Sequence, residues 1–190
     1  MNLAYFILLL TTSVMSSCAY QLSTKIESLP GGVRKIQIPI FKNASTEPGA
    51  EVFFTNALKQ EALRSSVVRL QNDESDAEAV LQGTLTKIDI IAEDSVMESE
   101  NNPYLPKRNV LANQYKVTAY VDLVLKKRGT TTVLWRGNFT QTKNFPAAAI
   151  TLPVINSSNA LYNQSAKRQT LDALSKEMMQ AGFDRMIENF

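Results

Sequence analysis

One cysteine near the N-terminus is the residue of this sequence with the most clearly defined chemistry. Cys18 follows Met15-Ser16-Ser17, and small residues directly before a cysteine are what a lipoprotein signal peptidase requires. The apolar residues 3–10 have the length of a signal-peptide core and are too few to cross a bilayer as a helix. We therefore expect cleavage before Cys18 and lipidation of its thiol. An ordinary secretory signal with an incidental cysteine is the alternative.

The lipid on Cys18 would anchor the mature chain to a membrane, because several acyl chains together hold a protein stably on a bilayer. The following residue is Ala19 rather than Asp, which by the usual sorting rule favours the outer membrane. We therefore expect an outer-membrane, lipid-anchored protein that faces the periplasm. Residues 1–17 are then a signal peptide, residues 18–32 a lipidated linker, and residues 33–190 a single domain.

The composition excludes several kinds of active site. The chain has no histidine, and Cys18 is its only cysteine, so the commonest general base and the usual zinc ligands are missing. No Gly-x-Ser-x-Gly or Ser-x-x-Lys pattern supplies a nucleophile. We predict a protein that is not an enzyme and needs neither a metal nor a cofactor. A net charge of +2 gives no global nucleic-acid signature, so any basic site must be local.

Two local groups of basic residues could bind phosphate. Lys107 and Arg108 follow Tyr104-Leu105-Pro106 in a long polar segment, and cations beside apolar side chains suit a phosphorylated glycolipid. A solvated loop is an equally good interpretation of this pair. Lys126-Lys127-Arg128 is the densest basic run and falls at a predicted hairpin turn. There, a charged turn that prevents edge pairing is the favoured interpretation, and contact with anionic lipid or a barrel wall is the other.

Hydrophobic periodicity predicts the elements that hold these residues. Apolar residues at helical spacing favour helices over residues 47–65 and 158–190. Apolar and polar residues alternate in the predicted strands, which cover residues 34–41, 67–70, 79–91, 114–126 and 131–143. Residues 93–113 are predicted to form a long loop. This order predicts an α+β two-layer sandwich, in which two amphipathic helices cover one face of the sheet.

The strand predicted over residues 114–126 has the clearest pattern. Its odd-numbered residues are apolar and would face the helices. Lys116, Tyr120 and Asp122 would lie on the other face, open to solvent or to a partner, and Lys126 shares that face. Within residues 79–91 the alternation is disturbed, which predicts a β-bulge.

Several segments together resemble the lipopolysaccharide-assembly lipoprotein family (LptE-like). The matching segments are Cys18-Ala19-Tyr20-Gln21-Leu22, Ile38-Pro39-Ile40-Phe41-Lys42-Asn43, Glu47-Pro48, Phe54-Thr55-Asn56-Ala57-Leu58, Asp76-Ala77, Val80-Leu81-Gln82-Gly83 and Val133-Leu134-Trp135-Arg136, followed by the helix that closes at residues 183–190. Ala19 stands where glycine is common in the family. The resemblance spans nearly the whole mature chain.

The resemblance implies a four-stranded, mainly antiparallel sheet with two helices on one face, in a non-enzymatic outer-membrane lipoprotein. It implies that the protein plugs a β-barrel translocon of the LptD type, helps that barrel to assemble, and binds lipopolysaccharide during its insertion in the outer leaflet. In the family, a basic residue of the inter-strand loop contacts lipopolysaccharide, which implies this role for Lys107 and Arg108. Lys126, Lys127 and Arg128 are further candidates for lipopolysaccharide binding.

Three other functions fit parts of the sequence. An auxiliary lipoprotein of a lipid-transport ATPase system would share the anchor and an α/β domain, but would act without a barrel. An envelope hydrolase is disfavoured because histidine and a nucleophile motif are both missing. A purely structural envelope lipoprotein is the third alternative.

Overall fold

The computed structural model describes residues 28–98, 110–147, 149–151, 156–158 and 160–188. Its elements are β1 (Lys35–Gln37), β2 (Lys42–Asn43), α2 (Ala50–Arg64), β3 (Arg69–Gln71), β4 (Ala79–Glu98), β5 (Val110–Lys127), β6 (Val133–Pro146), β7 (Ala149–Thr151), β8 (Asn156–Ser158) and α3 (Ala160–Glu188). Two short 3-10 turns, η1 (Pro30–Gly32) and η2 (Glu74–Asp76), precede β1 and β4.

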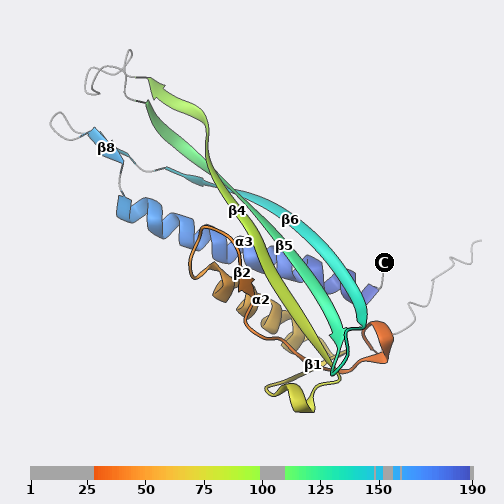
Figure 1. The fold of residues 1–190 in the computed structure, drawn as a ribbon. Helices are drawn as coiled ribbons and strands as arrows, with labels where there is room; N and C mark the ends of the chain where they lie inside the picture. The colour runs from red at the N-terminus through yellow and green to blue at the C-terminus, as the bar shows by residue number, and fades with distance from the viewer. Residues whose placement is uncertain (1–27, 99–109, 148, 152–155, 159, 189–190) are drawn as a thin grey trace, which may run out of the picture.

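The main sheet has six strands in the order β3-β1-β4-β5-β6, with β2 also paired to β4. The three long strands β4, β5 and β6 form an antiparallel meander, whereas β1, β2 and β3 are short and pair in parallel. Both long helices, α2 and α3, lie on one side of this sheet (Figure 1). Strands β7 and β8 form a separate two-stranded sheet.

The predicted α+β class with two helices on one face is confirmed, but the expected four-stranded, mainly antiparallel sheet is wrong in detail. The sheet is mixed and six-stranded because three short strands add parallel pairs at one edge. β1 and β3 lie where strands were predicted over residues 34–41 and 67–70, but strands of two or three residues carry too little alternation to indicate how they pair. The strand predicted over residues 34–41 is shorter in the structure, since β1 ends at Gln37 before Pro39, which has no N–H for a ladder, and β2 begins only at Lys42.

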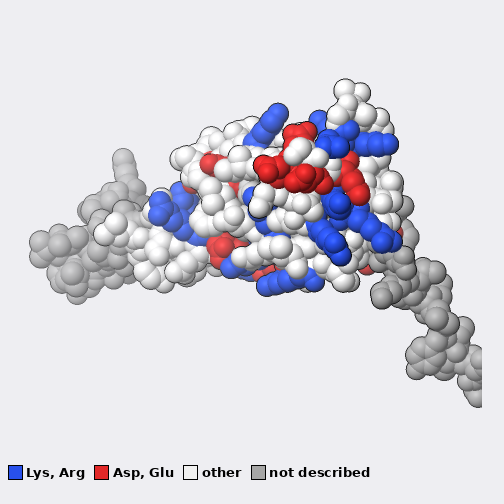
Figure 2. All heavy atoms as spheres, turned by 90° about the horizontal axis from the view of Figure 1, so that it is seen from below, with Lys and Arg blue, Asp and Glu red and all other residues white. Residues whose placement is uncertain are grey.

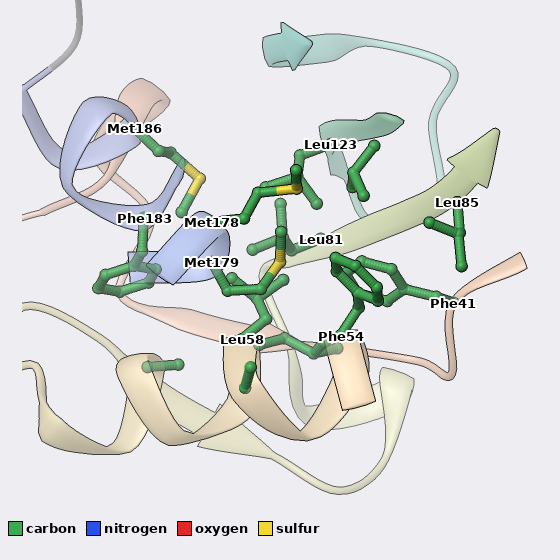
Figure 3. Close-up of a cluster of buried hydrophobic side chains, with 14 of the residues drawn as sticks. Phe41, Phe54, Leu58, Leu81, Leu85, Leu123, Met178, Met179, Phe183 and Met186 are labelled. Atoms are coloured by element: carbon green, nitrogen blue, oxygen red, sulfur yellow. The ribbon is translucent and has the colours of Figure 1, made fainter. Parts of the chain in front are cut away.

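The core lies between the sheet and the helices. Figure 3 shows Phe54 and Leu58 of α2 meeting Met178 and Met179 of α3 over the strands. The buried residues that complete this core include Leu81, Leu85, Val117, Ala119, Val121, Leu123, Leu125, Leu174, Phe183 and Met186. The odd-numbered residues of β5 from Val117 to Leu125 therefore face the helices, as their alternation predicts.

A β-bulge in β4 changes which residues face the core. The register with β5 shifts between Leu85 and Lys87, which confirms the predicted bulge. Leu85 and Ile88 are consequently both buried, although they are an odd number of residues apart. Lys87 lies on the other side of the sheet from them, and the alternation then continues toward Glu98 in the shifted phase.

The loop predicted over residues 93–113 is strand at both of its ends, in residues 93–98 and 110–113. β4 continues to Glu98 and β5 begins at Val110, with Val96 opposite Ala112 in the ladder. In Figure 1, this hairpin reaches past the ends of the helices. Apolar residues are neighbours in it, as at Val96 and Met97 and at residues 110–112, so apolar and polar residues do not alternate there. The sequence therefore lacks the signature of a strand although the backbone is paired.

The sheet and its neighbours approach closely at two glycines. The ring of Phe41 lies against Gly83, where a Cβ atom would be 2.3 Å from the ring carbons. At Gly182 of α3, a Cβ atom would lie 3.2 Å from Leu123 Cδ1. Next to the first contact, the Phe41 backbone N–H donates to the buried Thr55 hydroxyl at 3.0 Å. These contacts fix the segment after β1 against α2 and β4.

Candidate functional site

The basic run Lys126-Lys127-Arg128 lies at the turn between β5 and β6, as predicted. The turn is closed by hydrogen bonds from the Lys127 N–H to Thr132 O at 3.0 Å and from the Thr130 N–H to Lys127 O at 3.3 Å. Gly129 has a φ of +68°, a conformation that glycine adopts without strain. Lys127 and Arg128 are exposed, and Lys126 is half-buried.

This turn is connected to the neighbouring loop through Arg128. The Arg128 backbone N–H donates to Glu78 O at 3.0 Å, and its guanidinium donates to Ser75 O. The cation is thereby held beside η2, whose Glu74 and Asp76 are exposed acids. The turn is therefore part of a larger charged surface and does not project alone.

Parallel pairing brings further cations to the same end of the sheet. Lys35 of β1 and Arg69 of β3 are register partners, and Arg34 precedes Lys35. A hollow of about 320 Å³ is lined by Arg34, Lys35, Ser66, Val67, Arg69 and Glu78. We call Arg34, Lys35, Arg69, Lys126, Lys127 and Arg128 the basic end.

Sequence reasoning missed Arg34, Lys35 and Arg69 as part of a site. Lys35 and Arg69 are far apart in the chain and meet only through the β1–β3 pairing, which the short strands did not reveal. The one local feature that Lys35 and Arg69 share is that each is a basic residue at the start of its strand. Figure 2, which views the molecule from below Figure 1, shows basic groups bordering acidic ones.

Glu78 is the acidic residue within the basic end. Its Oε2 accepts hydrogen bonds from the backbone N–H groups of Arg34 at 2.8 Å and Lys35 at 3.2 Å. These two amides, together with the nearby positive charges, hold the pKa of the Glu78 carboxyl below its usual range. The carboxylate therefore stays ionised and caps the start of β1.

The other predicted site residues, Lys107, Arg108 and Cys18, lie outside the described residues. Lys107 and Arg108 belong to the segment between Glu98 of β4 and Val110 of β5, at the opposite end of β5 from the basic turn. At about 3.3 Å per residue, the 18 residues of β5 span roughly 55 Å. In the chain, the two predicted basic groups thus stand at opposite ends of β5, one before its first residue and one at its last.

The face of the sheet away from the helices is polar, as predicted, and its side chains pair across strands. Thr118 and Thr142 share a hydrogen bond of 3.1 Å between their hydroxyls, and Asn138 donates to Asp122 at 2.5 Å. We call this surface, which the meander β4–β6 presents, the open face. In the described parts of the chain, no helix packs on it, so its side chains can meet a partner.

Glu93 is the acceptor for several groups on the open face. Its carboxylate pairs with the Lys116 ammonium and accepts from Asn144 Nδ2 at 2.8 Å. The bond from Lys116, followed by the bonds from the amides, lowers the pKa of the Glu93 carboxyl. The predicted placement of Lys116 and Lys126 on one face is confirmed by their register with Ile91 and Val80.

The side chains of the basic end and of the open face are suited to binding. Within the described ranges, no group of three or more His, Cys, Asp or Glu residues could hold a metal ion. No helix in that part of the chain is long and apolar enough to span a bilayer. Guanidinium, ammonium and hydroxyl groups at the basic end suit phosphate, and the open face offers amides and hydroxyls.

Comparisons with known proteins were made for sequence and for structure. The family model "LptE: Lipopolysaccharide-assembly" matches residues 33–189. No curated protein sequence matches the chain significantly. A putative neuraminyllactose-binding hemagglutinin homolog from Helicobacter pylori has a similar fold, with 15% identity and a TM-score of 0.50 over 83% of this chain and 88% of that chain.

Two solved lipoproteins are more distant in structure. A putative lipoprotein from Caulobacter crescentus CB15 has 12% identity and a TM-score of 0.47, with 78% of this chain and 88% of that chain covered. Rare lipoprotein B from Shewanella oneidensis has 16% identity and a TM-score of 0.39, with 80% of this chain and 92% of that chain covered.

Proposed function

The chain belongs to the LptE family of lipopolysaccharide-assembly proteins, and from this premise we propose that it plugs a β-barrel lipopolysaccharide translocon and helps that barrel to assemble. In this proposal it also binds lipopolysaccharide while the lipid is inserted in the outer leaflet. The family is non-catalytic, so the function is one of binding. The observation that carries the proposal is the family match, which extends over the entire α+β domain.

The open face supports a role as a plug. The lumen of a membrane β-barrel is polar, so a domain that enters it should meet the wall with polar side chains. Along β6, the open face presents Asn138, Thr140 and Thr142, which are exposed. The charged pair Lys116–Glu93 is neutral as a unit. We propose that this face contacts the barrel wall.

The lipid contacts are proposed at the far end of the β4–β5 hairpin. Lys107 and Arg108 would bind phosphates of lipopolysaccharide, with Tyr104 and Leu105 in contact with its apolar parts. Lys126-Lys127-Arg128 remains a second candidate. It would act as a separate contact, because roughly 55 Å of strand separates it from the hairpin end.

The anchor is proposed to be the lipid on Cys18. An acylated cysteine would hold the domain at the outer membrane, which raises its local concentration near a barrel embedded there. Replacement of Cys18 by serine should release the protein from the membrane fraction. Retention of the Cys18→Ser variant in that fraction would contradict lipid anchoring.

The barrel proposal is tested by purifying the tagged lipoprotein from detergent-solubilised outer membranes. We expect a large β-barrel to be recovered with it. Thr140→Arg, which places a charge on the open face, should reduce that recovery, whereas Gln60→Arg on the exposed side of α2 should not. Recovery of an inner-membrane transport ATPase and no barrel would favour the auxiliary-lipoprotein function instead.

Lipopolysaccharide binding is tested with the double variant Lys107→Glu and Arg108→Glu. We expect weaker capture of purified lipopolysaccharide and an unchanged circular dichroism spectrum. The matched control is Lys42→Glu with Lys176→Glu, which makes the same change in net charge at two exposed lysines elsewhere. Equal binding by the wild type and the first variant would reject this pair of residues as the lipid site.

A further inference from the structure

We propose that the basic end is a contact surface for the anionic phospholipid headgroups of the membrane that holds the anchor. The proposal rests on one part of the proposed function, the lipid on Cys18. It adds to that function a prediction of how the domain is oriented relative to the membrane. The end of the sheet with β1, β3 and the β5–β6 turn lies against the bilayer surface, and the β4–β5 hairpin points away from it.

The first support is a pair of like charges in register. Lys35 and Arg69 are Cα partners on neighbouring strands, so their side chains leave the sheet on the same side. Like charges placed opposite one another on neighbouring strands are unfavourable. Neither side chain forms an ion pair within the described residues. The Glu78 carboxylate in the lining of the same hollow offsets part of that repulsion, and an anion bound between the two cations would offset more of it.

The second support is the hollow beside this pair. Its volume of about 320 Å³ is at the small end of the range for ligand pockets, and its lining is polar or charged except for Val67. The Ser66 hydroxyl is a hydrogen-bond donor next to the cations. A hollow of this size and chemistry suits a headgroup phosphate and its glycerol, whereas it offers no apolar wall for an acyl chain.

The third support is the position of the N-terminal segment. Pro30–Gly32 forms η1 at the same end of the sheet, where a Cβ atom at Gly31 would lie 3.0 Å from Leu134 Cδ2 of β6. Cys18 and Ser28 are ten positions apart, and a chain of that length spans at most about 35 Å. An anchor at Cys18 therefore keeps the start of the domain within about 35 Å of the membrane, while the far end of β5 lies roughly 55 Å from the basic turn.

Acidic residues limit the strength of this contact. Asp73, Glu74, Asp76 and Glu78 lie in and beside η2 at the same end. The six cations of the basic end against these four acids leave an excess of two positive charges. Such a surface binds an anionic bilayer weakly by itself and contributes when a tether keeps it close. The contact thus orients an anchored domain and does not replace the anchor.

The experiment measures vesicle binding without the anchor. Residues 18–190 with Cys18→Ser are mixed at low salt with vesicles of phosphatidylcholine alone or with a third of phosphatidylglycerol, and binding is measured by co-sedimentation. We expect binding to the anionic vesicles alone, and its loss at high salt. Lys35→Glu with Arg69→Glu should weaken binding by at least about tenfold, since each basic side chain near an anionic membrane strengthens binding about fivefold.

Two further variants separate local contact from net charge and from misfolding. Lys42→Glu with Lys176→Glu changes the net charge equally and should keep most of the binding. Lys35→Arg with Arg69→Lys keeps both charges and should bind as the wild type does. An equal loss of vesicle binding in both charge-reversal variants would overturn the proposal. So would equal binding of the wild type to neutral and anionic vesicles. The proposal would also fail if the wild type bound no anionic vesicles, or bound them only when lipopolysaccharide is added.

The proposed barrel function is tested separately on the same proteins. Lys35→Glu with Arg69→Glu should still recover the barrel from detergent extracts, because these two residues lie on β1 and β3, outside the open face of the meander β4–β6. Failure of the wild type to recover a barrel would reject the plug function and leave the vesicle result unaffected. Failure of vesicle binding would reject the orientation and leave the plug function unaffected.

Discussion

The two faces of the β4–β6 meander are built from alternate residues of the same strands but have opposite properties. On the inner face, Leu81, Leu123 and Trp135 are buried beneath α2 and α3. On the open face, Thr118 pairs with Thr142 and Asn138 pairs with Asp122 across the strands. The inner face provides the stability of the domain, and the open face is left for contacts with other molecules.

This division has a clear energetic basis. Burial of an apolar side chain contributes about 1.5–3 kcal/mol, whereas an exposed polar pair contributes about 0.2–1 kcal/mol. Substitutions of neighbouring residues on one strand should therefore differ several-fold in their effect on stability. For binding to a partner we expect the reverse: substitutions on the open face should weaken it more than substitutions on the inner face. Substitutions on each face can separate the two roles.

The largest effect on stability is expected for Leu123→Ala. Leu123 is fully buried between the sheet and Gly182 of α3, so truncation should lower the free energy of unfolding by about 2–5 kcal/mol. Val124→Ala, one residue further on the open face, should cost less than about 1 kcal/mol. Urea denaturation measures both. Similar losses in the two variants would contradict the assignment of the faces.

The next largest effect is expected for Gly83→Ala. The new methyl group would meet the Phe41 ring at 2.3 Å, and the displacement of that ring should cost about 1–3 kcal/mol. Thermal denaturation of the single variant and of the double variant with Phe41→Leu tests this reason. If the smaller side chain at position 41 recovers none of the lost stability, steric conflict with Phe41 is not the cause.

A small effect is expected for Thr142→Ala on the open face. The substitution removes the hydroxyl that bonds to Thr118, an exposed contact worth about 0.2–1 kcal/mol. The midpoint of urea denaturation should therefore change little. A loss above about 2 kcal/mol would show that the open face also holds the domain together.

The smallest effect is expected at Glu78, and it depends on pH. Because the folded state lowers the pKa of this carboxyl from 4.5, the unfolded chain takes up the proton first as the pH falls. The stabilisation is present above pH 4.5 and is lost as the pH falls through the lowered pKa. Glu78→Gln should therefore reduce stability at neutral pH and leave it unchanged in strong acid. The same loss of stability at every pH would contradict the assignment of this effect to the ionised Glu78 carboxylate.

The elements predicted from sequence were those in which one face is apolar over many residues. β5 and α3 have this property, and their buried residues follow directly from their periodicity. Strands were also predicted where β1 and β3 lie, but β2 and the parallel pairing of these strands were not, because each pairs over only two or three residues. Their order in the sheet depends on contacts between distant parts of the chain, which local periodicity does not indicate.

The candidate site could be predicted only where basic residues are neighbours in the chain. The run at Lys126 has this property and was found at the expected turn. Lys35 and Arg69 meet through strand pairing, and nothing in their local sequence signals the contact. The extended β4–β5 hairpin was missed for a different reason. Its apolar residues are neighbours instead of alternating with polar ones, as at Val96 and Met97, and without alternation the sequence does not indicate a strand.

The position of β1 has a mechanical consequence for a domain held by its N-terminal segment. A pulling force on that segment reaches η1 and β1 before any other element of the sheet. β1 is joined to β3 by three register pairs and to β4 by two, whereas β4 and β5 pair along most of their length. Under tension β1 should therefore detach first, while the meander and its helices remain folded. A pulling force at the membrane would then break the few hydrogen-bonded pairs of β1 before it unfolds the rest of the domain.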